Sequence, residues 1–70
     1  MDEFDDRTRA NMDVVLEEIC GEMAHGGDHD SRKFIAERLI ESAREGRTSL
    51  AELNSTARRA LLELVNRKAS

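Results

Sequence analysis

Apolar residues recur at three- and four-residue spacings in three stretches of the chain, the pattern of amphipathic helices. Polar and charged residues fill the positions between them. The stripe of the first stretch consists of Met12, Val15, Leu16, Ile19 and Met23, bordered by Thr8 and Cys20. The second consists of Ile35, Ala36, Leu39, Ile40 and Ala43, and the third of Leu50, Leu53, Ala57, Leu61 and Leu64.

Capping residues predict helices over about 6–24, 31–45 and 49–68. Asp5 or Asp6 can cap the first helix, and the glycines and aspartates of residues 25–30 can end one helix and cap the next. Gly46 supplies a second stop, and Ser49 with Glu52 forms a capping box. Residues 54–56 are poor helix formers, so we expect one final helix with a possible break there.

The sequence predicts an all-α fold, an antiparallel three-helix bundle in one small domain over residues 1–70, with residues 1–5 frayed. Proline is absent and β-branched and aromatic residues are few, so no strands are expected. A single core in 70 residues stabilises a fold by only ~3 to 5 kcal/mol. Association with a partner would compensate for so small a core.

Three apolar residues do not fit the stripes. Val14 and Phe34 lie opposite the stripes of their helices on a helical wheel, and Leu62 lies well off its own. Single exposed hydrophobic residues are common. If these three join in one patch, however, they would bind a partner helix or a second copy. We therefore expect a protein-interaction or adaptor module, and a homodimer is one form that it could take.

Charge is unevenly distributed along the chain. Residues 1–30 hold ten acidic and two basic residues, whereas residues 47–70 hold two acidic and five basic ones. The alternative function is a nucleic-acid-associated regulator that uses Arg58, Arg59, Arg67 and Lys68 of the last helix. The net charge of −4 and the absence of Tyr and Trp weigh against it, and pairing with the acidic first helix explains the basic residues without a ligand.

Catalytic and metal chemistry have little support in the sequence. Cys20, His25 and His29 are weak metal candidates, because structural zinc needs four converging ligands and their spacing matches no zinc motif. No nucleophile elbow, phosphate loop or metalloprotease motif is present, so we expect neither an enzyme nor a cofactor. The acidic amino terminus, the lack of a long apolar run and the single cysteine favour a cytoplasmic protein without a membrane span.

Several short segments carry a family resemblance. They are Ala10-Asn11-Met12, Leu16-Glu17-Glu18 with Cys20, Gly26-Gly27-Asp28-His29, Arg32-Lys33, and Ala57-Arg58-Arg59-Ala60-Leu61. In these segments the chain resembles short, functionally uncharacterised helical proteins of rhizobia-like α-proteobacteria. The resemblance extends from Ala10 to Leu64 and implies a bacterial cytoplasmic protein. It implies no activity and no functional residues.

Overall fold

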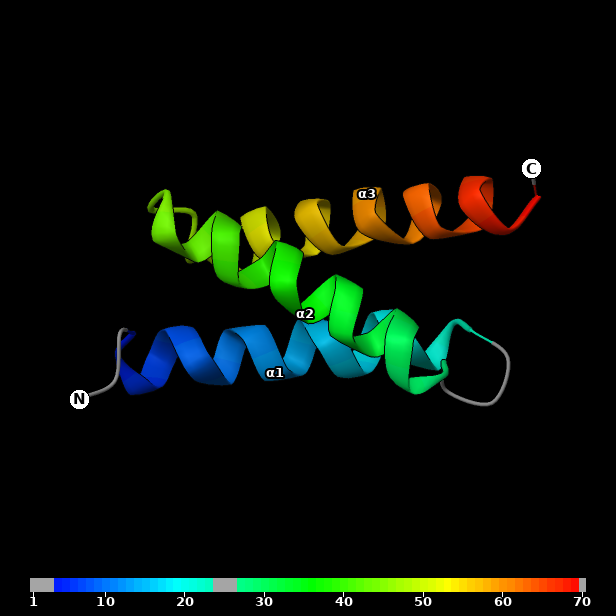
Figure 1. The fold of residues 1–70 in the computed structure, drawn as a ribbon. Coiled ribbons are helices and arrows are strands. Elements are labelled where there is room, and N and C mark those ends of the chain that lie inside the picture. The colour runs from blue at the N-terminus through cyan, green and yellow to red at the C-terminus, as the bar shows by residue number, and fades with distance from the viewer. Residues whose placement is uncertain (1–3, 24–26, 70) are drawn as a thin grey trace.

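The computed structural model confirms the all-α three-helix bundle (Figure 1). It describes residues 4–23 and 27–69, with the backbone alone for residues 68 and 69. Helix α1 spans Asp6–Gly21, α2 spans His29–Arg44 and α3 spans Leu50–Ala69. Helices α1 and α3 run in the same direction, and α2 runs back between their ends at an angle to both (Figure 1).

Helix α1 begins where the sequence predicts and ends earlier. Asp5 is the N-cap, and its carboxylate accepts a hydrogen bond of 2.8 Å from the Thr8 backbone N–H. The helix ends at Gly21, three residues before the predicted end, because the Glu22 N–H bonds to the carbonyls of Ile19 and Cys20 and tightens the last turn. Residues 1–3, which are part of the segment 1–5 that was expected to fray, and residues 24–26 of the predicted stop lie outside the described residues.

Helix α2 begins two residues earlier than predicted because Asp28, rather than Asp30, is its N-cap. The Asp28 carboxylate accepts a hydrogen bond of 2.8 Å from the Ser31 N–H. At its other end, Gly46 has a φ of 92° and donates to the Ala43 carbonyl, while the Arg47 N–H bonds to the Ser42 carbonyl. This pair of bonds is a Schellman motif, so the predicted glycine stop is confirmed.

Helix α3 is continuous through residues 54–56, so the break considered from the sequence does not occur. The Ser49 hydroxyl accepts a hydrogen bond from the Glu52 N–H and donates to the Glu52 carboxylate. Two of the three polar side chains in this segment also have partners within the helix. Asn54 accepts from Arg58 Nε one turn later, and the Thr56 hydroxyl bonds to the Glu52 carbonyl.

The core lies along the common axis of the three helices and follows the predicted stripes closely. Its buried members are Val15, Ile19, Ile35, Leu39, Leu53, Ala57, Ala60 and Leu64. Leu50 was predicted to belong to it and is instead 49% exposed, because it lies in the first turn of α3. Thr8, Ser31 and Ser42 are also buried, and in the described part of the chain no buried polar side-chain atom lacks a hydrogen-bond partner.

Candidate interaction surface

Helices α2 and α3 meet along a seam of paired side chains. Ser42 and Thr56 share a hydrogen bond of 2.9 Å between their hydroxyls. One turn before Ser42 on α2, Arg38 Nη2 lies 3.1 Å from a carboxylate oxygen of Glu63. We call these residues, with Phe34 and Arg67 at the far end, the α2–α3 seam. Polar groups on both sides of this seam are satisfied within the chain.

Phe34 is placed differently from the sequence prediction. It does not project from the outer side of α2 but is partly buried and packs against the core. The guanidinium carbons of Arg38 and Arg67 lie 5.1 and 5.6 Å from the centre of its ring, within cation–π range. The assignment to the outer face was wrong because Ser31 and Ser42 are buried, so the core-facing side of α2 is rotated toward Phe34.

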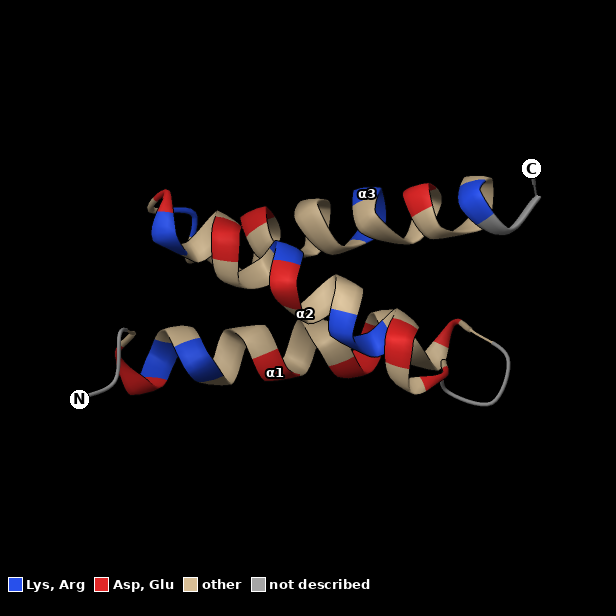
Figure 2. Cartoon of the chain, viewed as in Figure 1, with Lys and Arg blue, Asp and Glu red and all other residues tan. Residues whose placement is uncertain are grey.

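Two shallow grooves lie over the seam, and both are lined mainly by polar and charged residues. One has a volume of about 470 Å³ and runs beside Arg38, Ser42, Thr56 and Glu63. The other, of about 570 Å³, lies beside Phe34, Leu64 and Arg67. Figure 2 shows that all three helices carry charges of both signs. Neither groove therefore presents the single sign of charge that would select an anionic or a cationic ligand.

Exposed apolar residues lie elsewhere, on α1 and α3. Val14 is 48% exposed and Leu62 is 64% exposed, as their positions off the stripes predict. Leu50 and Val65 are also exposed, at 49% and 55%. Among the described residues, α2 contributes no large exposed hydrophobic side chain. Val65 was not among the predicted exposed residues, although its position directly after core Leu64 places it outside the stripe.

Two contacts fix which edges of α1 and α3 face each other. Asn11 Nδ2 donates to the Thr48 carbonyl at 3.0 Å, and Arg58 Nη2 lies 3.2 Å from a Glu22 carboxylate oxygen. Residues three, four or seven positions away from Asn11, Glu22 or Arg58 lie along the same edges of α1 and α3. We call this surface the α1–α3 face; it comprises Asn11, Val14, Glu18 and Glu22 of α1, and Leu50, Asn54, Arg58, Leu61, Leu62 and Val65 of α3.

The structure does not gather the three predicted partner-binding residues into one patch. Val14 and Leu62 both belong to helices of the α1–α3 face. Phe34 lines the groove with Leu64 and Arg67, and neither Val14 nor Leu62 lines that groove. The off-stripe residues therefore divide into a pair with exposed side chains and an aromatic ring that belongs to the α2–α3 seam.

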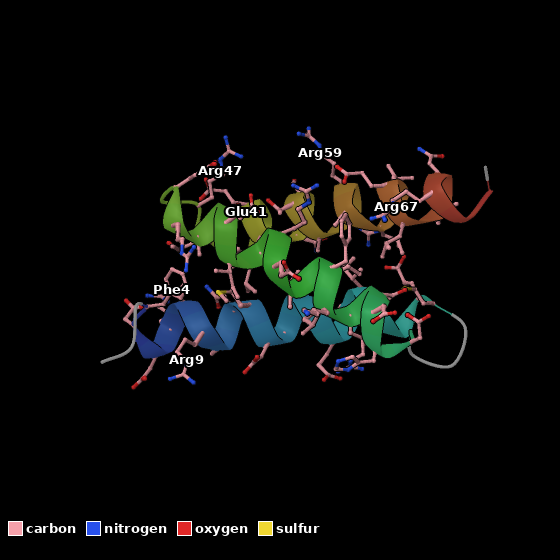
Figure 3. The ribbon with its side chains drawn as sticks, in the orientation of Figure 1. Phe4, Arg9, Glu41, Arg47, Arg59 and Arg67 are labelled. Atoms are coloured by element: carbon pink, nitrogen blue, oxygen red, sulfur yellow. The ribbon has the colours of Figure 1, made fainter. Side chains whose placement is uncertain are left out.

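The basic residues proposed for nucleic acid are dispersed around α3. Arg58 pairs with Glu22, whereas Arg67 lies against Phe34 on the α2 side. Arg59 lines the groove beside Arg38 and Glu63 and points away from the bundle (Figure 3). The Lys68 side chain lies outside the described residues. With α3 unbroken, the short helix, turn and longer helix that would favour groove reading are not formed.

The weak metal candidates are not brought together among the described residues. Cys20 is buried in the bundle, and burial raises the pKa of its thiol. His29 is exposed in the first turn of α2, and His25 lies outside the described residues. In residues 4–23 and 27–67, no three His, Cys, Asp or Glu side chains are placed to share a metal ion.

Together, the fold and its exposed residues define a small three-helix protein with one polar, internally paired side and one partly apolar side. The chain matches no protein-family model, no curated protein and no solved structure. None of the helices in the described segments has both the length and the apolar character needed to cross a bilayer.

Proposed function

We propose that the protein is a non-enzymatic interaction module that binds another protein chain through the α1–α3 face. The observation that carries this proposal is the distribution of exposed apolar side chains. Val14, Leu50, Leu62 and Val65 all lie on α1 or α3, and described α2 has no such residue. Covering these side chains removes apolar surface from water, at about 25 cal/mol per Å², and adds to the stability of a small core.

The polar side of the molecule supports the same division of roles. In the α2–α3 seam, Arg38 is paired with Glu63 and the Ser42 hydroxyl with that of Thr56. Bringing a partner onto this side would require desolvating groups that are already satisfied. An apolar contact on the α1–α3 face carries no such cost at Val14, Leu62 or Val65.

We also propose a bacterial cytoplasmic location, which rests on the single buried thiol of Cys20 and on the resemblance to short α-proteobacterial proteins. The resemblance itself stays a prediction. The alternative role in nucleic-acid binding has no observation in its favour, since Arg58 and Arg67 are engaged within the chain on different sides of α3.

Site-specific photocrosslinking in living cells tests the interaction directly. A photoreactive amino acid is placed at Val14 or at Leu62, and in a matched control at Glu37, an exposed residue of α2 that lines the groove beside Phe34. We expect protein adducts from positions 14 and 62 and none from position 37. Equal adducts from all three positions, or none from any of them, would contradict the proposal.

A further inference from the structure

We propose that the partner of the α1–α3 face is a second copy of this chain, related by a two-fold axis that runs parallel to the helices. This inference rests on the proposed interaction function and specifies its partner. In the resulting dimer, α1 of each copy lies against α3 of the other. The same surface is used twice, as two-fold symmetry requires.

The arrangement of residues along the face supports self-pairing. Val14 and Leu50 lie toward one end of the face, and Leu61, Leu62 and Val65 lie toward the other. Glu18 and Arg58 lie between these apolar groups. An interface of this kind excludes water at its ends and contains a charged pair that fixes the alignment of the helices.

The direction of the helices decides between the two possible symmetry axes. Helices α1 and α3 run in the same direction (Figure 1). A two-fold axis parallel to them therefore places α1 opposite α3 of the second copy. This rotation leaves the position of every residue along the helix axis, which we call its level, unchanged. An axis across the helices would instead place α1 on α1, bringing acidic Glu18 and Glu22 toward their own copies.

Charge favours the first arrangement. On the α1–α3 face itself, α1 contributes the acidic residues Glu18 and Glu22, and α3 contributes the basic residue Arg58. Asn11 contacts Thr48, and Glu22 contacts Arg58, so Glu18 is level with a point between Asn54 and Arg58. Glu18 of one copy then lies about one turn, ~5.4 Å along the axis, from Arg58 of the other, within reach of an arginine side chain.

Glu18 is available for such a contact. Both Glu18 and Glu22 are exposed, but Glu22 already pairs with Arg58 inside the chain. Arg58 has several N–H donors in a planar group, so it can bind Glu22 of its own chain and Glu18 of the second copy together. The dimer would therefore contain two Glu22, Arg58 and Glu18 clusters related by the symmetry axis.

Sedimentation equilibrium of the full chain tests the proposal by mass. We expect a species of twice the 7.9 kDa chain mass. Glu18→Lys should weaken the dimer roughly tenfold, and adding Arg58→Glu should recover part of the loss. The matched control is Glu37→Lys, the same charge change at an exposed position of α2. Leu62→Glu should weaken the dimer roughly a hundredfold, because it places a charge in an apolar contact.

Cysteine crosslinking tests the orientation. A mixture of Glu18→Cys and Arg58→Cys chains should form a disulfide-linked pair on mild oxidation, whereas Glu18→Cys alone should not. Efficient linkage of Glu18→Cys to itself would overturn the proposed axis. Circular dichroism of each variant establishes that the helices are retained, so a loss of dimer reports on the interface rather than on folding.

The outcomes separate this inference from the proposed function. A wild-type monomer at high concentration overturns self-pairing. If position 62 still crosslinks to a different protein in cells, the interaction function stands with another partner. If position 62 crosslinks to nothing and the chain is monomeric, both proposals fail. A dimer that is weakened by Glu37→Lys and not by Glu18→Lys uses another face and overturns the inference.

Discussion

The two sides of α3 differ in how many of their side chains have partners within the chain. Toward α2, the side chains pair across the seam, from the hydroxyls of Ser42 and Thr56 to the ring of Phe34 and the guanidinium of Arg67. Toward the α1–α3 face, Leu62 and Val65 remain more than half exposed. One helix therefore contributes to an internal contact on one side and leaves apolar surface on the other.

This difference shows where the stability of the bundle and its capacity for binding reside. Substitutions in the core or the α2–α3 seam remove interactions that already exist, so they should lower the free energy of unfolding. Substitutions of the exposed apolar residues Val14, Leu62 and Val65 on the α1–α3 face should leave folding of the single chain almost unchanged.

The largest contrast is between Leu39 and Leu62. Leu39 is 1% exposed in the core, and Leu39→Ala should lower the free energy of unfolding by ~2 to 5 kcal/mol through lost burial and a residual cavity. Leu62→Ala should change it by no more than ~0.5 kcal/mol. Urea denaturation at a low protein concentration, at which association does not contribute, measures both. Similar losses for the two variants would remove the distinction between core and face.

A smaller effect is expected at the hydroxyl pair of the seam. Thr56→Val keeps the side-chain shape but leaves the Ser42 hydroxyl, which is buried, without its partner. We expect a loss of ~1 to 3 kcal/mol in the free energy of unfolding. Ser55→Ala, at the exposed neighbouring position, is the control and should have little effect. If Thr56→Val were neutral, the hydrogen bond would contribute nothing to the contact between α2 and α3.

Phe34 should give an intermediate result. Phe34→Leu preserves most of the apolar contact with the core but removes the ring that faces Arg38 and Arg67, so we expect a loss of ~0.5 to 1 kcal/mol. Phe34→Glu should cost more, because it places a carboxylate against the core. Thermal unfolding followed by circular dichroism distinguishes the two. A Phe34→Glu protein as stable as wild type would return Phe34 to the list of exposed contact residues.

The smallest effect concerns Asp5, which belongs to neither region. Hydrogen bonds from the side chain and the backbone of Thr8 lower the pKa of Asp5 below its ordinary value of 3.8. The charged cap therefore stabilises α1 above pH 3.8, and this stabilisation is lost as the pH falls through the lowered pKa. The melting temperatures of wild type and Asp5→Asn should converge in acid. A gap that widened in acid would contradict this assignment.

The helices and their caps could be predicted from the sequence because they depend on local chemistry. Asp5, Gly46 and Ser49 act through backbone groups within a few residues of themselves, so spacing along the chain is sufficient. The starting point of α2 was missed by two residues because Asp28 and Asp30 are both good caps. Local pattern does not choose between two such residues in one turn.

The orientation of α2 could not be predicted from apolar spacing. Ser31 and Ser42 face the core but add nothing to an apolar stripe, so the predicted stripe was displaced away from Phe34. The positions of Val14 and Leu62 were predicted correctly because α1 and α3 have no comparable buried serines. The pairing of Arg58 with Glu22 depends on the relative level of two helices, which only the assembled bundle defines.

The short connection between α2 and α3 has a consequence for how the chain folds. Gly46 and Arg47 each donate one backbone hydrogen bond that closes α2, and Ser49 caps α3 soon afterwards, so little loop entropy is lost in bringing these helices together. The contacts of Ser42 with Thr56 then form between near neighbours in sequence. We therefore expect the α2–α3 hairpin to form early in folding and α1 to dock onto it, and helical folds with such local contacts fold in about microseconds to milliseconds.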